Sequence, residues 1–146
     1  MIRSLYEAHL KVNDLERSID FYKKIGLQLS YREEKAAFMW IVPGESWIGL
    51  WESEAKGIPT THIAFGIAYE DMQHAIAWLR ERNIEPVEFK GMQPLEPIAR
   101  PSQANCSVYF NDPDGNSLEL ICNLPDAPRD LPKMYLSEWE KLRQQR

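Results

Sequence analysis

Two histidines and one glutamate stand at matching positions in two similar halves of this 146-residue sequence. The segment that begins at His9 corresponds to the segment that begins at His62, and in the same alignment Gly49 corresponds to Glu119. Two imidazoles and one carboxylate are a common ligand set for a catalytic divalent metal. A single strand histidine is more often structural, but three such residues at matching positions predict a metal site of His9, His62 and Glu119.

The elements that must position these residues follow the same order in each half. Hydrophobic periodicity and capping residues predict strand, helix and three strands in both, which makes the fold α+β with two β-α-β-β-β modules. The first-half elements are expected at 5–12, 15–25 after the N-cap Asp14, 27–33, 37–42 and 47–53. The second-half elements are expected at 61–68, a helix begun by Asp71 and ending near 82–83, 86–90, 105–110 and 116–122.

The last hairpin gives Glu119 a predicted neighbour. Tyr109 precedes Glu119 by ten residues, and a turn at 113–115 would make the two residues cross-strand partners on one face. The tyrosine either fills the core or lies beside the metal. Cys106 and Cys122 fall on the opposite face, where they are expected to be buried and reduced.

Glu52 is excluded as a fourth ligand by its position in the strand. It follows Gly49 by three residues, and an odd offset turns a side chain to the other face of a strand. Gly49 itself leaves the fourth position without a carboxylate.

Two segments outside the repeat have predicted roles. The loop at 91–104 holds three prolines and has the length of a segment that covers a site. The tail at 123–146 is rich in proline, and Ser137 with Glu140 could cap a short helix in it.

Composition excludes several classes of protein. The net charge of −5 argues against a nucleic-acid partner, because such binding depends on clustered Lys and Arg. No apolar run approaches the roughly 18 residues that span a bilayer, and the N-terminus does not read as a signal peptide. Two cysteines do not make a disulfide framework. We therefore expect a cytoplasmic protein with no membrane or nucleic-acid partner.

Three motifs, at 9–22, 61–65 and 112–120, together make the chain resemble the vicinal oxygen chelate superfamily. Its members include glyoxalase I, fosfomycin-resistance enzymes, extradiol dioxygenases and metal-free bleomycin-binding proteins. The resemblance covers about Leu5 to Cys122. It implies a glyoxalase-like fold in which the modules form a concave sheet, with a single domain at 1–122 followed by the tail. Module 1 would span about 4–54 and module 2 about 60–122.

The resemblance also implies a function. His9, His62 and Glu119 would hold one divalent metal per chain, either Mn, Ni, Zn, Fe or Co, and relatives build such sites in homodimers. The metal would chelate a small oxygenated substrate for lyase, isomerase or thiol-transfer chemistry. The protein would then be a metal-dependent lyase or transferase acting on a small molecule.

Further site residues come from the same resemblance. Tyr109 would act at the metal, and Trp47 and Ser107 match pocket-lining residues of glutathione-type fosfomycin enzymes. Arg129 lies one residue from that group's phosphonate-binding arginine, so Arg129 and Arg100 are candidate anion contacts. Against that group, position 11 is lysine rather than threonine, and 101–105 lacks its potassium-binding pattern.

Two alternatives stay open. The chain could be a small-molecule sequestering protein of the bleomycin-resistance type, although such relatives tend to lack the His-His-Glu set. It could also be an extradiol dioxygenase, but the acid–base histidine of those enzymes is replaced here by Trp47. The glycine at position 49 weighs against a standard glyoxalase reaction.

Overall fold

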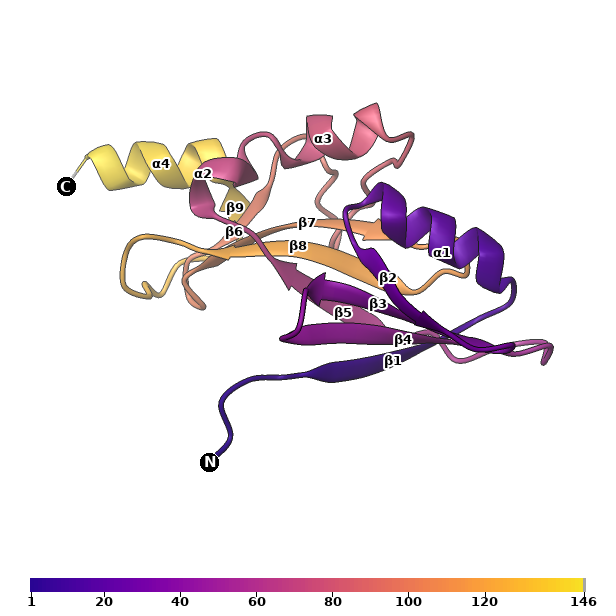
Figure 1. The fold of residues 1–146 in the computed structure, drawn as a ribbon. Helices are drawn as coiled ribbons and strands as arrows, with labels where there is room; N and C mark the ends of the chain where they lie inside the picture. The colour runs from indigo at the N-terminus through magenta and orange to yellow at the C-terminus, as the bar shows by residue number, and fades with distance from the viewer. Residues whose placement is uncertain (146) are drawn as a thin grey trace. The chain divides into compact units, whose positions relative to one another are not determined.

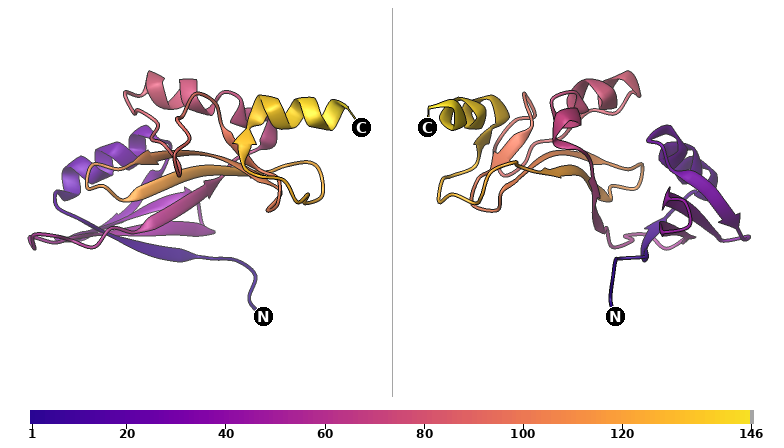
Figure 2. Two further views of the ribbon diagram at one scale, coloured as in Figure 1. Left: turned by 180° about the vertical axis from the view of Figure 1, so that it is seen from behind. Right: turned by 60° about the vertical axis from the view of Figure 1, so that its left-hand side comes forward.

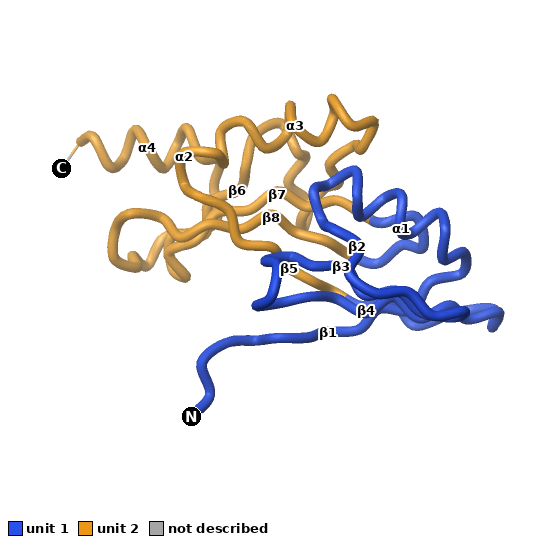
Figure 3. The backbone as a smooth tube through the Cα atoms, viewed as in Figure 1, with its two compact units in different colours: residues 1–61, 112–116 blue, residues 62–111, 117–146 orange. Residues whose placement is uncertain are grey.

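The computed structural model describes residues 1–145, which form two compact units (Figure 3). Unit 1 comprises residues 1–61 with 112–116, and the described part of unit 2 comprises residues 62–111 with 117–145. The turn of the last hairpin therefore belongs to unit 1, while both of its strands belong to unit 2.

Unit 1 is a four-stranded sheet with one helix across one face (Figure 1). Its strand order is β1-β4-β3-β2, in which β1 runs parallel to β4 and the other pairs are antiparallel. The elements are β1 (Glu7–Val12), α1 (Leu15–Lys24), β2 (Gln28–Arg32), β3 (Ala36–Val42) and β4 (Ser46–Glu52). The predicted β-α-β-β-β order is confirmed.

Helix α1 begins at the predicted residue, after the N-cap Asp14. The side chain of Asp14 accepts a hydrogen bond from the Arg17 amide at 3.1 Å, which satisfies one free N–H of the first turn. The helix ends one residue earlier than predicted, and Gly26 then takes the left-handed conformation with φ of 104°. Its apolar side, which includes Ile19 and Tyr22, is buried.

The turn at 112–116 is anchored by buried polar groups. Asp112 Oδ1 accepts hydrogen bonds from the backbone amides of Asp114 and Asn116, each at 2.9 Å. Its Oδ2 accepts one from the hydroxyl of Tyr22 at 2.8 Å, and burial raises the pKa of that phenol. Asp114 in turn accepts from the Asn13 amide at 2.9 Å. The Asp-Pro-Asp-Gly-Asn motif thus fixes this turn within unit 1.

Unit 2 is a five-stranded sheet of order β5-β8-β7-β6-β9. Helices α2, α3 and α4 lie on one face of it, as Figures 1 and 2 show from several sides. The elements are β5 (His62–Gly66), α2 (Tyr69–Met72), α3 (Ala75–Glu81), β6 (Ile98–Arg100), β7 (Asn105–Asn111), β8 (Ser117–Asn123), β9 (Met134–Tyr135) and α4 (Leu136–Gln144).

Several predicted elements of unit 2 were wrong in detail. The helix begins at Tyr69 after the N-cap Ala68, rather than after Asp71, and it is broken between α2 and α3. Residues 86–90 make only isolated bridges, of which one joins Val87 to Tyr109. The loop at 91–104 contains strand β6, whose pairing with β7 could not be foreseen because its sequence is short and irregular.

The C-terminal tail packs onto unit 2. Strand β9 pairs with β6, and α4 buries Trp139. A helix was predicted here, but Ser137 and Glu140 do not cap it. The amide and hydroxyl of Ser137 both donate to the carboxylate of Glu96, at 3.0 and 2.9 Å.

The helix-side face of unit 2 holds both cysteines. Cys106 and Cys122 are direct partners across β7 and β8, and both are buried, as predicted. Within residues 1–145, no helix is long and apolar enough to cross a membrane.

Candidate functional site

Glu119 is the buried carboxylate of unit 2, with 5% of the residue exposed. It lies on β8 directly opposite Tyr109 on β7, which confirms the predicted pairing. Its Oε2 lies 3.0 Å from Nη2 of Arg100 and also accepts a hydrogen bond from the hydroxyl of Ser107. A buried carboxylate requires such donors because its charge has lost its contacts with water.

His62 faces the other oxygen of this carboxylate. Its Nδ1 lies 3.0 Å from the carbonyl oxygen of Ser117 and 3.1 Å from the Ser117 hydroxyl, which can donate or accept. When Nδ1 carries the ring proton toward the carbonyl, the lone pair of Nε2 faces Glu119 Oε1 at 2.9 Å. In that tautomer a proton or a metal ion must lie between the two acceptors. The donor set therefore fits a divalent cation.

The charges around Glu119 keep it ionised. Burial alone would raise the pKa of the Glu119 carboxyl. The hydrogen bonds from Ser107 and Arg100, together with the positive charge of Arg100, have a larger opposite effect, so that the pKa is lowered. Burial likewise disfavours the Arg100 cation, but its contacts with Glu119 and Tyr109 raise its pKa. The pair is thus a stable carboxylate and guanidinium at neutral pH.

Tyr109 is held in place by its ring and by its hydroxyl. The ring stacks on Phe89 with centroids 4.5 Å apart and an angle of 6° between planes, and a guanidinium N–H of Arg100 donates to the phenol oxygen. Burial raises the pKa of the Tyr109 phenol. The hydroxyl therefore stays protonated at neutral pH and can donate a hydrogen bond.

His9 stands on the sheet of unit 1. Its side chain is 50% exposed, and it borders a cavity of about 480 Å³ that Lys11, Trp51 and Thr61 also line. His9 Nε2 lies 3.4 Å from Oε2 of Glu7, two residues earlier on β1. This imidazole is accessible to a ligand.

Gly49 lies opposite His9 in the parallel pairing of β1 and β4. A Cβ atom at position 49 would come within 2.9 Å of His9 Cδ2 and within 3.1 Å of ring atoms of both Phe38 and Trp51. Any side chain at position 49 would therefore crowd three rings, which disfavours a carboxylate there.

The two modules do not repeat their parallel register. His9 pairs with Gly49, but His62 pairs with Ser117 and Glu119 pairs with Ala64. The offset is two residues, which keeps every side chain on its expected face because side chains alternate along a strand. His62 therefore still reaches Glu119, diagonally rather than directly.

The predicted site residues divide between the units. Unit 2 brings together His62, Glu119, Tyr109, Ser107 and Arg100. Unit 1 holds His9 and Trp47. Within the described part of either unit, no three His, Cys, Asp or Glu side chains gather into a metal-binding group.

Arg129 does not join this cluster. Its backbone amide donates to the Pro101 carbonyl, and no hydrogen bond or ion pair among the described residues joins its side chain to Glu119. Sequence reasoning missed Phe89 and Glu7. Glu7 could have been found from its position two residues before His9, which places both on one face of a strand.

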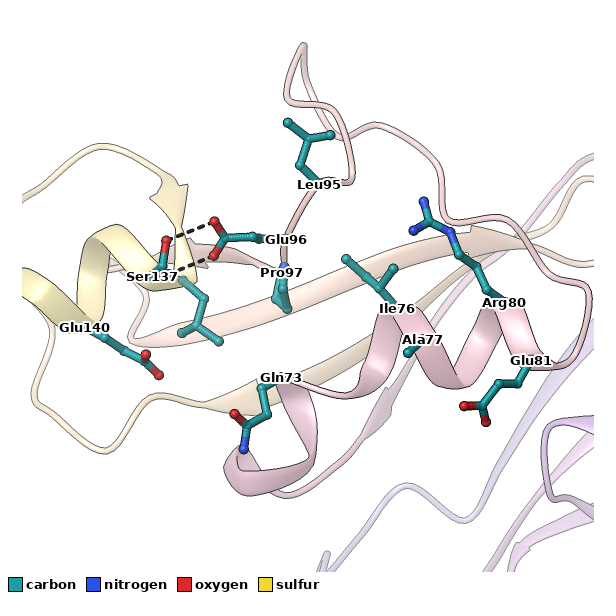
Figure 4. A pocket seen from close by; sticks show the side chains of 11 residues that line it. Gln73, Ile76, Ala77, Arg80, Glu81, Leu95, Glu96, Pro97, Ser137 and Glu140 are labelled. Atoms are coloured by element: carbon teal, nitrogen blue, oxygen red, sulfur yellow. Dashed lines mark hydrogen bonds between the residues drawn. The ribbon is translucent and has the colours of Figure 1, made fainter.

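A larger cleft of unit 2 lies apart from these residues, on its helical side (Figure 4). It has a volume of about 670 Å³, and its lining includes Ile76, Arg80, Leu95, Glu96 and Ser137. It contains no histidine or cysteine, and its one hydroxyl is engaged with Glu96. The Glu119 cluster is therefore the stronger candidate for chemistry.

The chain belongs to the glyoxalase/bleomycin resistance protein/dioxygenase superfamily, whose sequence profile matches residues 6–120. The fold and the resemblance predicted from the motifs are thereby confirmed.

Curated relatives are transferases. The chain is 29% identical to a metallothiol transferase FosB of Staphylococcus saprophyticus, over 97% of this chain and 95% of that protein. It is 36% identical to FosB of Staphylococcus epidermidis, over 82% and 81%. It is 32% identical to a glutathione transferase FosA of Serratia marcescens, over 82% and 81%.

Solved structures share the fold. The fosfomycin-resistance protein FosX of Listeria monocytogenes, crystallised with Mn(II) and sulfate, matches with a TM-score of 0.64 and 25% identity, over 86% of this chain and 94% of that one. A glyoxalase/bleomycin resistance protein/dioxygenase from Nocardioides matches with a TM-score of 0.66 and 26% identity, over 90% and 91%.

Proposed function

We propose that the protein is a divalent-metal-dependent transferase that joins a thiol to a small oxygen-rich substrate. His9, His62 and Glu119 would hold one metal ion per chain. The observation that carries the proposal is the 2.9 Å approach of His62 Nε2 to the buried Glu119 carboxylate. The transferase relatives and the manganese in FosX support the same chemistry.

The metal, when bound, would act as a Lewis acid on chelating substrate oxygens. The remaining chemistry would fall to side chains of unit 2. The thiol would lose its proton, its sulfur would form a bond to a substrate carbon while a carbon–oxygen bond breaks, and the released oxygen would gain one proton, so that the number of protons is unchanged. Tyr109 is protonated at neutral pH and can donate toward that oxygen, while Arg100 supplies positive charge beside it.

Metal binding can be tested directly on purified protein. We expect about one Mn²⁺ per chain in the wild type and little in His62→Ala, because that change removes a ligand whose side chain is 51% exposed. His74→Ala provides the matched control, since His74 lies at the start of α3. Full metal content in His62→Ala would overturn the proposal.

Thiol transfer is tested on the metal-loaded protein. Fosfomycin is the first substrate to try, with glutathione and cysteine as thiols, and the adduct is detected by mass spectrometry. We expect a metal-dependent adduct that is lost in Glu119→Gln. Tight binding of the substrate with no turnover would instead favour a sequestering function, and would overturn the transferase proposal for this substrate.

A further inference from the structure

Glu7 lies beside His9 in unit 1, and Glu119 lies beside His62 in unit 2. Glu7 Oε2 lies 3.4 Å from Nε2 of His9, just as Glu119 Oε1 lies 2.9 Å from Nε2 of His62. Each unit therefore directs one imidazole nitrogen toward one carboxylate. This correspondence is not a product of the sequence repeat, because the carboxylates come from different strands, β1 and β8.

The carboxylate of Glu7 is held by a neighbouring indole. Trp47 is its partner in the pairing of β1 with β4, and Trp47 Nε1 donates to Glu7 Oε1 at 2.8 Å. The bond engages one oxygen and leaves the other toward His9. The side chains of His9 and Glu7 are 50% and 40% exposed, so both can be reached by a metal ion from solvent.

The packing around His9 leaves little room for a carboxylate from β4. The position on β4 that corresponds to Glu119 is Gly49, where an added Cβ would lie 2.9 to 3.1 Å from three ring atoms. Glu7 lies on the same face of β1 as His9, two residues away. Glu7 can therefore place a carboxylate beside His9, where β4 carries the glycine at position 49.

We infer that Glu7 joins His9 as a ligand of the proposed metal ion. This inference rests on the proposed function, because it requires His9 to bind the metal. Glu7 would also add a negative charge at the ion, where the charge of Glu119 is already paired with that of Arg100.

The test uses Glu7→Gln, whose amide oxygen can still accept the Trp47 hydrogen bond while the charge is lost. Mn²⁺ affinity is measured from the free-ion EPR signal during titration. We expect the dissociation constant to rise about tenfold or more. Glu54→Gln is the control, since this glutamate of unit 1 is 89% exposed, and it should bind as the wild type does.

A second readout separates a ligand from a charge that only lies nearby. At saturating Co²⁺, loss of a ligand changes the number or type of donor atoms and therefore alters the visible absorption bands. We expect altered bands in Glu7→Gln. Weaker binding with unchanged bands would overturn the assignment of Glu7 as a ligand.

The outcomes also separate this inference from the proposed function. If His62→Ala loses the metal while Glu7→Gln binds as tightly as the wild type, the role of Glu7 is overturned and the proposed function stands. If both variants keep wild-type affinity, both proposals fail.

Discussion

Arg100 Nη2 lies 3.0 Å from Glu119 Oε2, and the two side chains are only 12% and 6% exposed. The guanidinium engages one carboxylate oxygen and leaves the other, Oε1, facing His62. Arg100 also donates to Ser107 at 2.6 Å and to the Tyr109 phenol. One cation thus organises both the proposed metal ligand and the proposed proton donor.

Arg100→Met should destabilise unit 2 by about 3 kcal/mol in metal-free protein, because removing one partner leaves a buried carboxylate without its cation. Urea unfolding with a chelator measures this change. Mn²⁺ at about 100 times its dissociation constant should restore roughly 2.7 kcal/mol by linkage. Arg80→Met breaks the exposed Arg80–Glu85 pair and should cost under about 1 kcal/mol. Equal losses in the two variants would contradict this account of Arg100.

Gly49→Ala should destabilise the protein by about 1–3 kcal/mol, since the added carbon would overpack the rings of His9, Phe38 and Trp51. It should also weaken Mn²⁺ binding by displacing His9. Gly66→Ala is the matched control in a strand, because a Cβ there meets nothing within 4 Å. Thermal unfolding and metal titration check both variants. A Gly49→Ala protein as stable as Gly66→Ala would refute the packing argument.

Glu52 gives a prediction about acid stability. The amide of Leu15 donates to its carboxylate at 2.9 Å, and this bond, with that of Lys35, lowers the Glu52 pKa. A carboxyl with a lowered folded-state pKa stabilises the fold above its unfolded value of about 4.3, and this contribution is lost as pH falls through the folded-state pKa.

Glu52→Gln should therefore lower the melting temperature at pH 7, and its difference from wild type should shrink below about pH 4. Melting curves from pH 7 to pH 3 test this, with the more exposed Glu54→Gln as a control that should follow wild type. A difference that is constant across this range would show that the carboxylate charge is not responsible.

Local patterns in the sequence were sufficient for much of the fold. Strand alternation and the Asp14 cap correctly predicted unit 1, and the same alternation placed Glu52 away from His9, where it bonds to Leu15. In the last hairpin, spacing alone predicted the pairing of Tyr109 with Glu119. These features depend on neighbours within one strand or one turn.

What could not be predicted depends on contacts between distant segments. Strand β6 forms only because it pairs with β7 and β9, and its three residues carry no periodic signal. Arg100 was predicted only as an anion contact, and its bond to Glu119 spans 19 residues. The need for glycine at position 49 likewise follows from rings on three strands.

The division of the ligands between the units leads to a prediction about assembly. His9 belongs to unit 1, while His62 and Glu119 belong to unit 2. A second copy of the chain can supply to each unit the ligands that this unit lacks. We therefore predict a homodimer with two equivalent sites, each taking His9 from one subunit and His62 with Glu119 from the other.

Subunit mixing tests this shared site. His9→Ala and Glu119→Ala should each be inactive alone, but a heterodimer of the two would contain one site with all three ligands and one site with neither His9 nor Glu119. If half of the dimers are mixed, metal binding should recover to about a quarter of the wild-type level. Native mass spectrometry verifies that the two variants have exchanged subunits. His9→Ala protein alone, treated in the same way, serves as the control. If heterodimers form and no binding returns, His9 must act with His62 and Glu119 of its own chain.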